Sequence, residues 1–238
     1  MPVNAFEKLY IALRTTEGRI YNEMDIAKLP IVAESDPHYK EWLLRKNSCD
    51  KLKRYIKQHP KICNILDIGC GNGWLSAQLA SVTTGCVTGV DINALELDQG
   101  RRAFSGTPNL NFIHGEIRGG ILGDSKYDLI VFAAAMQYFS SLKEILQTAA
   151  KYLTLQGEIH IMDTHFYKPH EVPLARLRSE NYFTERGFPE MGDYYFHHNI
   201  EDLRGFPFVV LHDPHSWINK LLFNRNPFHW IVIKTRLR

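Results

Sequence analysis

The order of apolar and polar positions predicts strands that each lead into a helix through the middle of the chain. Short apolar runs, typical of buried strands, occupy 62–68, 86–90, 110–114, 127–132 and 158–163. Helical spacing follows in the segments 74–80, 94–104 and 142–153. Because strands that alternate with helices form parallel sheets with helices on both faces, the pattern predicts a doubly wound α/β fold.

The segments on either side of this pattern predict further elements. Residues 1–60 contain an early amphipathic stripe and a long helical pattern that starts at Asp36-Pro37. We expect 1–60 to be an N-terminal helical cover on one structural unit, 61–238, although packing against the sheet edge would explain the same apolar residues. The last third predicts helices over 171–182 and 216–223 and short strands over 194–198, 208–211 and 228–234.

Composition is that of an ordinary soluble globular protein. The 238 residues are 45% apolar and 23% charged, and 28 Lys and Arg against 26 Asp and Glu leave a net charge of +2. This balance argues against duplex nucleic acid as the main partner. The longest apolar run, 129–136, is far shorter than a membrane span. The cysteines form no Cys-x-x-Cys pair and the N-terminus lacks a signal pattern, which predicts reduced thiols in a cytoplasmic protein.

A loop with glycine at every second position joins the first predicted strand to its helix. Glycine permits positive φ and removes side chains, so the backbone of such a loop can press against a ligand. The helix N-terminus that follows offers unpaired N–H groups to a carboxylate or a phosphate. A dinucleotide fingerprint would need its last glycine where this chain has Trp74, so the spacing disfavours a nicotinamide cofactor.

The form acidic-x-Gly-x-Gly-x-Gly resembles motif I of the class I S-adenosylmethionine-dependent methyltransferases, in particular their type-11-like branch. The resemblance covers residues 60–165 well. It implies a Rossmann-like, mostly parallel seven-stranded sheet whose last strand is antiparallel. It also implies S-adenosylmethionine as methyl donor and S-adenosylhomocysteine as product. The loop residues expected at this cofactor are Asp67, Gly69, Cys70, Gly71, Asn72 and Gly73.

Acidic residues follow the second and third predicted strands. Asp91 lies twenty positions after Gly71, which matches the carboxylate that accepts hydrogen bonds from ribose hydroxyls in βαβ nucleotide sites. Ile92 would then pack on the adenine face. The alternative is that Asp91 merely caps the next helix. The resemblance implies that Glu116 accepts from the adenine amino group and that the Ile117 backbone serves a ring nitrogen, although a solvated surface glutamate would give the same pattern.

The fourth predicted strand opens into three alanines followed by Met136, Gln137 and Tyr138. In an open α/β sheet the ligand crevice lies beyond the carboxyl ends of the strands, where the strand order reverses. We therefore expect Ala133 beside the methionine part of the cofactor, and residues 136–138 beside the methyl group and its acceptor. Arg45, in the long N-terminal helix, is a candidate partner for the cofactor's carboxylate.

The segment 133–139 contains no strong acid or base that would activate an acceptor. The chain also lacks the Asn/Asp-Pro-Pro-Tyr/Phe motif of nucleic-acid amino-methylating enzymes and the paired-glutamate loop of arginine methyltransferases, which favours a small-molecule acceptor. His165, His197 and His198 are candidate bases, and each is more simply explained as a structural or surface histidine. In a strand, the two adjacent histidines would point to opposite faces, which does not suit a metal site.

These observations predict a methyltransferase that acts on a small molecule, with no nucleic-acid, membrane or metal partner expected. Two alternatives remain. One is a protein that keeps the cofactor pocket without catalysis, for example as a partner subunit. The other is a nicotinamide-dependent oxidoreductase on a similar sheet, which Trp74 disfavours.

Overall fold

The computed structural model describes residues 3–216 and 226–234. Its strands are Ile65–Ile68 (β1), Val87–Asp91 (β2), Leu110–His114 (β3), Tyr127–Ala133 (β4), Leu153–Thr164 (β5), Phe208–His212 (β6) and His229–Lys234 (β7). Its α-helices are Val3–Thr16 (α1), Glu23–Ile26 (α2), Tyr39–Gln58 (α3), Trp74–Ala80 (α4), Ala94–Ala103 (α5), Leu142–Ala150 (α6) and Val172–Glu185 (α7). Single turns of 3₁₀ helix include Ile117–Gly119 (η1) and Met136–Tyr138 (η2), and a longer one covers Pro189–Tyr194 (η4).

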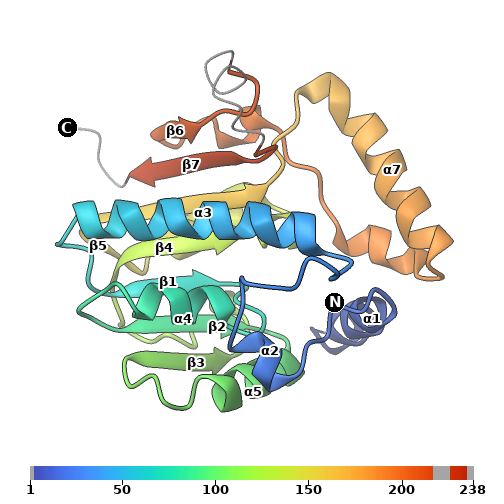
Figure 1. Cartoon of the computed structure of the whole chain (residues 1–238). Helices are drawn as coiled ribbons and strands as arrows, with labels where there is room; N and C mark the ends of the chain where they lie inside the picture. Colours follow the sequence, from blue (N-terminus) through green and yellow to red (C-terminus); the bar gives the residue numbers. More distant parts are fainter. Residues whose placement is uncertain (1–2, 217–225, 235–238) are drawn as a thin grey trace.

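The strands form one sheet in the order β3-β2-β1-β4-β5-β7-β6, which confirms the doubly wound architecture (Figure 1). Strands β1 to β5 are parallel to one another, and β7 is antiparallel to both β5 and β6. β1 and β4 are adjacent although β2 and β3 separate them in sequence. The strand order therefore reverses between β1 and β4, and a ligand crevice is expected beyond their carboxyl ends.

Helices cover both faces of this sheet. α3 and α4 pack on one face with Leu129 and Val131 of β4, and Figure 1 shows α3 lying along that face. α6 covers the other face with Ile130 and Phe132 of β4. All four strand residues are fully buried, so β4 alternates between two cores, as its continuous apolar run predicts for a central parallel strand.

A third, smaller cluster lies off the sheet. Figure 1 shows α1 and α7 beyond the carboxyl ends of the parallel strands. Leu13 of α1, Phe183 of α7 and Met191 of η4 are buried against one another there. The N-terminal segment thus divides into two parts. α1 covers the strand ends, whereas α3 packs on a face of the sheet rather than on its edge.

Two element boundaries differ from the prediction for local reasons. β1 begins at Ile65 rather than at 62, because the N–H groups of Cys63 and Asn64 donate to the Asp128 carboxylate at 3.1 and 2.9 Å. α3 begins only after the Asp36-Pro37 pair, because Asp36 Oδ1 accepts the His38 N–H at 2.7 Å in a preceding turn. In both places a carboxylate satisfies backbone donors that the predicted element would have used.

The strand predicted over 194–198 is wrong. η4 extends to Tyr194, and the residues after it cross the strand ends. The Phe196 N–H donates to the Gln137 carbonyl at 2.7 Å, and the His198 carbonyl accepts from Tyr167 at 2.9 Å. The backbone groups are therefore bonded to η2 and to the segment after β5 instead of to a neighbouring strand. A helix was also predicted over 216–223, and all but the first of these residues lie outside the described ranges.

Two further expectations concern the environment of the chain. Across the ranges that the structure describes, no helix is long and apolar enough to cross a membrane. Cys49, Cys63, Cys70 and Cys86 form no disulfide in the structure, and their reduced state in the cell stays a prediction.

Candidate active site

Three adjoining cavities follow the carboxyl ends of the central strands. Cavity A, of about 90 Å³, lies beside α3 and α4. Cavity B, of about 480 Å³, lies beside α5 and η1. Cavity C, of about 410 Å³, lies against α7. Ala134, at the end of β4, lines all three, so they form one crevice at the point where the strand order reverses.

The three glycines of the loop after β1 have different roles. All adopt positive φ, at 74° for Gly69, 54° for Gly71 and 72° for Gly73. A Cβ at Gly69 or Gly73 would lie 2.6 or 2.2 Å from another side chain, so packing requires both, and Gly73 lines none of the cavities. A Cβ at Gly71 would lie 3.5 Å from the Glu96 carboxylate, in ordinary contact. Gly69 and Gly71 both line cavities A and B, and because packing does not require Gly71, its missing side chain leaves room for a ligand.

Polar side chains hold this loop in place. Asp67 is buried and accepts a hydrogen bond from Ser76 Oγ at 2.7 Å, and burial raises its pKa to about 7. Asn72 Oδ1 accepts the Trp74 N–H at 3.2 Å. Asp67, Asn72 and Cys70 all line cavity A. The structure therefore brings these predicted residues to the crevice, with the side chains of Asp67 and Asn72 bonded within the loop and α4.

Asp91 reaches back from the end of β2 to the glycine loop. Its Oδ2 accepts the Gly71 N–H at 2.7 Å, and its Oδ1 accepts the Asn93 N–H at 2.8 Å. The α5 N-cap is Asn93, whose side chain accepts the Glu96 N–H at 3.2 Å, so the alternative role of Asp91 as that cap is wrong. Asp91 and Ile92 line cavity B, and burial raises the pKa of the Asp91 carboxyl.

The residues after β3 form the far end of cavity B. Glu116 lines this cavity and is ion-paired with Arg118. Ile117 also lines it, with a side chain that is buried in the core below. β2 and β3 therefore bring one carboxylate each to the same cavity, the arrangement that the methyltransferase resemblance implies for ribose and adenine.

Cavity A is rich in arginine. Arg14, Arg19 and Arg45 line it and alternate with two glutamates in a ladder that joins α1 to α3. Arg14 pairs with Glu17 at 2.9 Å, Arg19 with Glu41 at 2.6 Å, and Arg45 with Glu41 at 2.8 Å. Three guanidinium groups against two carboxylates leave one positive charge in the ladder. The sequence pointed to Arg45 alone, because the apolar stripe of α1 gave no sign that Arg14 faces the crevice.

Buried carboxyl groups face the same cavity. Burial raises the pKa of Glu96 to about 7 and that of Asp163 to about 6. Cavity A thus holds guanidinium groups for a carboxylate and the Glu96 carboxyl group for an ammonium, which matches a zwitterionic amino acid. Cavity B, with Asp91 and Glu116, matches a nucleoside. The two together fit S-adenosylmethionine, with Gly71 between them.

The residues after β4 divide the cofactor cavities from cavity C. Tyr138 lines B and C, and its hydroxyl accepts a hydrogen bond from Arg14 at 3.1 Å. Gln137 lines cavity C and Ala133 lines cavity A. Met136 is placed differently from the prediction. Its side chain is fully buried in the core with α6, because the η2 turn directs it away from the crevice.

The three predicted histidines separate. His165 and His197 line cavity C, and His197 Nε2 lies 2.9 Å from Ser179 Oγ. Burial and the nearby Arg176 guanidinium lower the pKa of His197 to about 4. His198 is buried outside the three cavities, with Nε2 3.0 Å from a carbonyl of η2, which is a structural role. Among the described residues, no group of three or more His, Cys, Asp or Glu side chains is arranged to hold a metal ion.

Asp163 is the residue whose role the sequence did not reveal. It lies near the end of β5 and lines both cavity A and cavity C. Ser48 Oγ donates to its Oδ1 at 2.5 Å. Its φ is 52° and that of Ala134 is 53°, and these are the positive-φ residues other than glycine in the described chain. Such strained backbone is uncommon and is concentrated at functional sites.

The strand order and the composition of the crevice agree with the resemblance to class I methyltransferases. The family model described as "Methyltransferase domain" matches residues 65–157, which include the glycine loop, Asp91 and Glu116. Residues 65–157 are therefore similar to a methyltransferase domain, and S-adenosylmethionine is the cofactor of class I methyltransferases. This assignment favours the methyltransferase over the nicotinamide-dependent alternative.

Curated relatives share part of the chain. The malonyl-[acyl-carrier protein] O-methyltransferase of Halalkalibacterium halodurans is 31% identical over 112 residues, covering 45% of this chain and 41% of that protein. The release factor glutamine methyltransferase of Fusobacterium nucleatum is 38% identical over 144 residues, covering 59% of this chain and 38% of that protein. The matches thus span about two fifths of the length of these relatives.

Solved structures share the fold over most of the chain. The plantazolicin methyltransferase BpumL, in complex with a monoazolic desmethylPZN analogue and S-adenosylhomocysteine, superposes with a TM-score of 0.58 at 16% identity, and the match covers 98% of both chains. The magnesium protoporphyrin IX methyltransferase of Synechocystis, with bound S-adenosylhomocysteine, gives a TM-score of 0.56 at 17% identity over 90% of this chain and 94% of its own. These similarities show a common fold.

Proposed function

We propose that this protein transfers the methyl group of S-adenosylmethionine to a small-molecule acceptor held in cavity C. The observation that carries this proposal is the shared wall of two cavities. Arg14, Arg45, Ala134 and Asp163 line both cavity A, which fits the methionine part of the cofactor, and cavity C, which lies beside it. A methyl group on the sulfur at the border of these cavities would face the acceptor.

The bound cofactor would supply a methyl group that its sulfonium makes electrophilic. The protein then has to orient the acceptor and exclude water, which together supply much of a rate enhancement. In this proposal, the Gly71 backbone and Asp91 bind the nucleoside side, and Arg14 and Arg45 bind the carboxylate. Tyr138, at the border of cavities B and C, positions the acceptor.

Asp163 is the proposed general base. It borders both cavities, and its raised pKa of about 6 lies close to neutral pH, which suits a group that takes a proton from a hydroxyl acceptor. Ser48 holds one carboxylate oxygen at 2.5 Å and leaves the other for the acceptor. His165 and His197 line the same cavity and are the remaining candidates from the sequence.

The proposed cover is α1. The Glu7 carboxylate accepts the Ala94 N–H at 2.9 Å, which ties α1 to the first turn of α5 beside cavity B. Phe6, Glu7 and Tyr10 line that cavity, so α1 would shield the bound nucleoside from water. We propose residues 1–60 as this N-terminal cover and 61–238 as the catalytic unit, acting in the cytoplasm without a nucleic-acid partner.

A turnover assay tests the proposal. The purified protein is incubated with S-adenosylmethionine labelled at its methyl group and pools of small hydroxyl and carboxyl compounds. Transfer of label, with matching release of S-adenosylhomocysteine, is the expected result. Asp163→Asn should lower the rate while leaving the affinity for S-adenosylhomocysteine within about threefold of wild type, since the amide keeps the bond to Ser48. Cofactor binding without turnover on any pool would favour the non-catalytic alternative.

A further inference from the structure

The wall of cavity C is a continuous chain of rings. Tyr138 contacts Tyr195 edge-to-face at 5.8 Å between ring centroids, and Tyr195 contacts His197 at 5.3 Å. The chain continues from His197 to Tyr167 at 5.7 Å, and from Tyr167 to His165 at 5.6 Å. These rings come from three separate segments of the sequence. A wall of rings with their faces and edges exposed to one cavity is suited to a planar aromatic ligand.

The histidines of this wall are neutral at pH 7. Burial lowers the pKa of His165 and lowers that of His197 to about 4, and the Arg178 guanidinium acts in the same direction on both. His197 Nδ1 is buried without a hydrogen-bond partner among the described residues. The two histidines therefore add ring surface to the wall without adding positive charge.

The charge of cavity C is positive on the α7 side. Two of its carboxylates, Glu17 and Glu41, are each paired with arginines of the ladder between α1 and α3. Arg178 lines the cavity from α7, and the ion pairs between described residues involve other arginines. The Glu171 carboxylate, whose charge acts to raise the pKa of Tyr167, accepts the Lys168 N–H at 2.8 Å. Arg178, whose guanidinium also forms a hydrogen bond with the Tyr167 side chain, is thus a cation of cavity C that no ion pair between described residues neutralises.

We propose that the methyl acceptor is an aromatic hydroxyl compound with a carboxylate at the far end of its ring. The ring lies along Tyr138, Tyr195 and His197, the carboxylate binds Arg178, and the hydroxyl faces Asp163. A guanidinium binds a carboxylate through two parallel hydrogen bonds, which fixes the direction of the ring in the cavity. The cavity volume of about 410 Å³ suits a molecule of one or two rings. The inference rests on the function proposed above and specifies its substrate class.

The transfer step requires only the acceptor hydroxyl, the methyl group of the cofactor and the Asp163 carboxylate. The acceptor oxygen forms a bond to the methyl carbon while the carbon–sulfur bond breaks, and that electron pair stays on sulfur. The hydroxyl proton passes to the Asp163 carboxylate. The products are the aryl methyl ether and S-adenosylhomocysteine, with no oxidant or reductant required.

Equilibrium binding to the cofactor-loaded protein tests this substrate class without turnover. The affinity for S-adenosylhomocysteine is measured first. The saturated protein is then titrated calorimetrically with 4-hydroxybenzoate, 6-hydroxy-2-naphthoate, the neutral amides of both, and 4-hydroxycyclohexanecarboxylate. We expect at least one aromatic carboxylate to bind about tenfold to a hundredfold more tightly than its amide, the range expected for hydrogen bonds to a charged group. The non-aromatic carboxylate should bind more weakly than 4-hydroxybenzoate.

Two variants of α7 locate the anion. Arg178→Gln should erase the preference for carboxylate over amide and keep the affinity for S-adenosylhomocysteine. Arg176→Gln removes the same charge from the same helix, but Arg176 does not line cavity C, so this control should keep the preference. Both side chains are exposed, and both variants should fold.

The outcomes separate the two proposals. Equal binding of amide and carboxylate, a preference that survives Arg178→Gln, or no binding of either aromatic carboxylate to the loaded protein would each overturn the substrate class. In those cases normal binding of S-adenosylhomocysteine would leave the proposed function intact. A folded protein that does not bind S-adenosylhomocysteine would overturn the proposed function itself, and the substrate class with it.

Discussion

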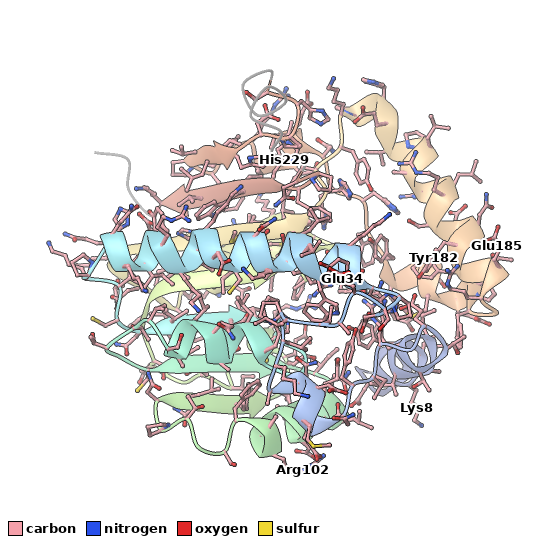
Figure 2. The ribbon with its side chains drawn as sticks, in the orientation of Figure 1. Lys8, Glu34, Arg102, Tyr182, Glu185 and His229 are labelled. Carbon is pink, nitrogen blue, oxygen red and sulfur yellow. The ribbon has the colours of Figure 1, made fainter. Side chains whose placement is uncertain are left out.

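The Arg14 guanidinium donates a hydrogen bond to the Tyr138 hydroxyl at 3.1 Å, across 124 positions of the sequence. Arg14 lines cavities A and C, and Tyr138 lines cavities B and C. The bond therefore lies where all three cavities meet, and it joins α1 to the turn after β4. Figure 2 labels Tyr182 on α7 next to α1, and its hydroxyl contacts Glu17, the partner of Arg14. The proposed cover, α1, and the wall of cavity C thus share one polar network.

Gly71→Val should abolish binding of S-adenosylhomocysteine by a folded protein. The added side chain would project beside Glu96 where Gly71 lines cavities A and B. The left-handed backbone at φ 54° adds a stability cost of about 1–2 kcal/mol. Calorimetric titration measures the affinity, and thermal unfolding checks the fold.

Gly123→Val is the matched control for this variant. Gly123 has the same φ of 54°, and a Cβ there would meet no heavy atom within 4 Å. The control should show a similar loss of stability and bind S-adenosylhomocysteine like wild type. If the folded Gly71 variant kept its affinity, the assignment of the glycine loop would be wrong.

Asp91→Ala should weaken the binding of S-adenosylhomocysteine by about 1–3 kcal/mol, the cost of losing charged hydrogen bonds. The Asp91 carboxylate lines cavity B and also orders the Gly71 N–H at 2.7 Å, so its loss affects both the ribose contacts and the loop. Calorimetry gives the affinity, and Asp91→Asn, which keeps one acceptor oxygen, should lose less. Unchanged affinity in both variants would exclude Asp91 from the cofactor site.

Arg45→Gln should weaken binding of S-adenosylhomocysteine by about 1–3 kcal/mol and leave binding of 5′-methylthioadenosine unchanged, because the latter lacks the amino-acid part. Arg45 lines cavity A from α3. Lys46→Gln is the control. Lys46 is the next residue along α3 and pairs with Asp50 at 2.7 Å outside the cavities, so removing its charge should change neither affinity. Equal losses for both ligands in the Arg45 variant would argue against a carboxylate contact.

The difference in the free energy of unfolding between Asp67→Asn and wild type should shift in favour of the variant as the pH rises from about 4 to 7. Burial raises the pKa of Asp67 from 3.8 to about 7, so over this window the unfolded chain ionises while the folded chain keeps its proton. Wild type therefore loses stability as the pH rises, by roughly 4 kcal/mol at most from this group. The side-chain amide of the variant cannot ionise, and its oxygen can still accept from Ser76.

Urea unfolding at pH 4.5 and pH 7.5 measures this difference. Asp124→Asn, an exchange at an exposed surface residue, should follow the wild-type pH dependence. An Asp67 variant that loses as much stability as wild type between the two pH values would contradict the raised pKa.

The central sheet could be predicted from the sequence because its information is local. The apolar run of β4 and the glycine pattern after β1 each specify an element and its position without reference to distant residues. Asp91 was predictable for the same reason, since its spacing from Gly71 follows from one strand–loop–helix–strand unit.

The acceptor side could not be predicted because it depends on tertiary packing. Tyr138, Tyr195 and Arg178 come from three segments that meet only when α7 folds over the strand ends. Residues after Tyr194 show the alternation of a strand, yet they bond to loops and line a cavity. Asp163 carried no motif, and only its position between two cavities reveals it.

Calorimetric titration with S-adenosylhomocysteine, with NAD as the control ligand, tests the central claim most directly. The arrangement of Gly71, Asp91 and the arginine ladder predicts micromolar or tighter binding of S-adenosylhomocysteine and no binding of NAD. A folded protein that binds neither ligand, or that binds NAD instead, would contradict the assignment of this crevice.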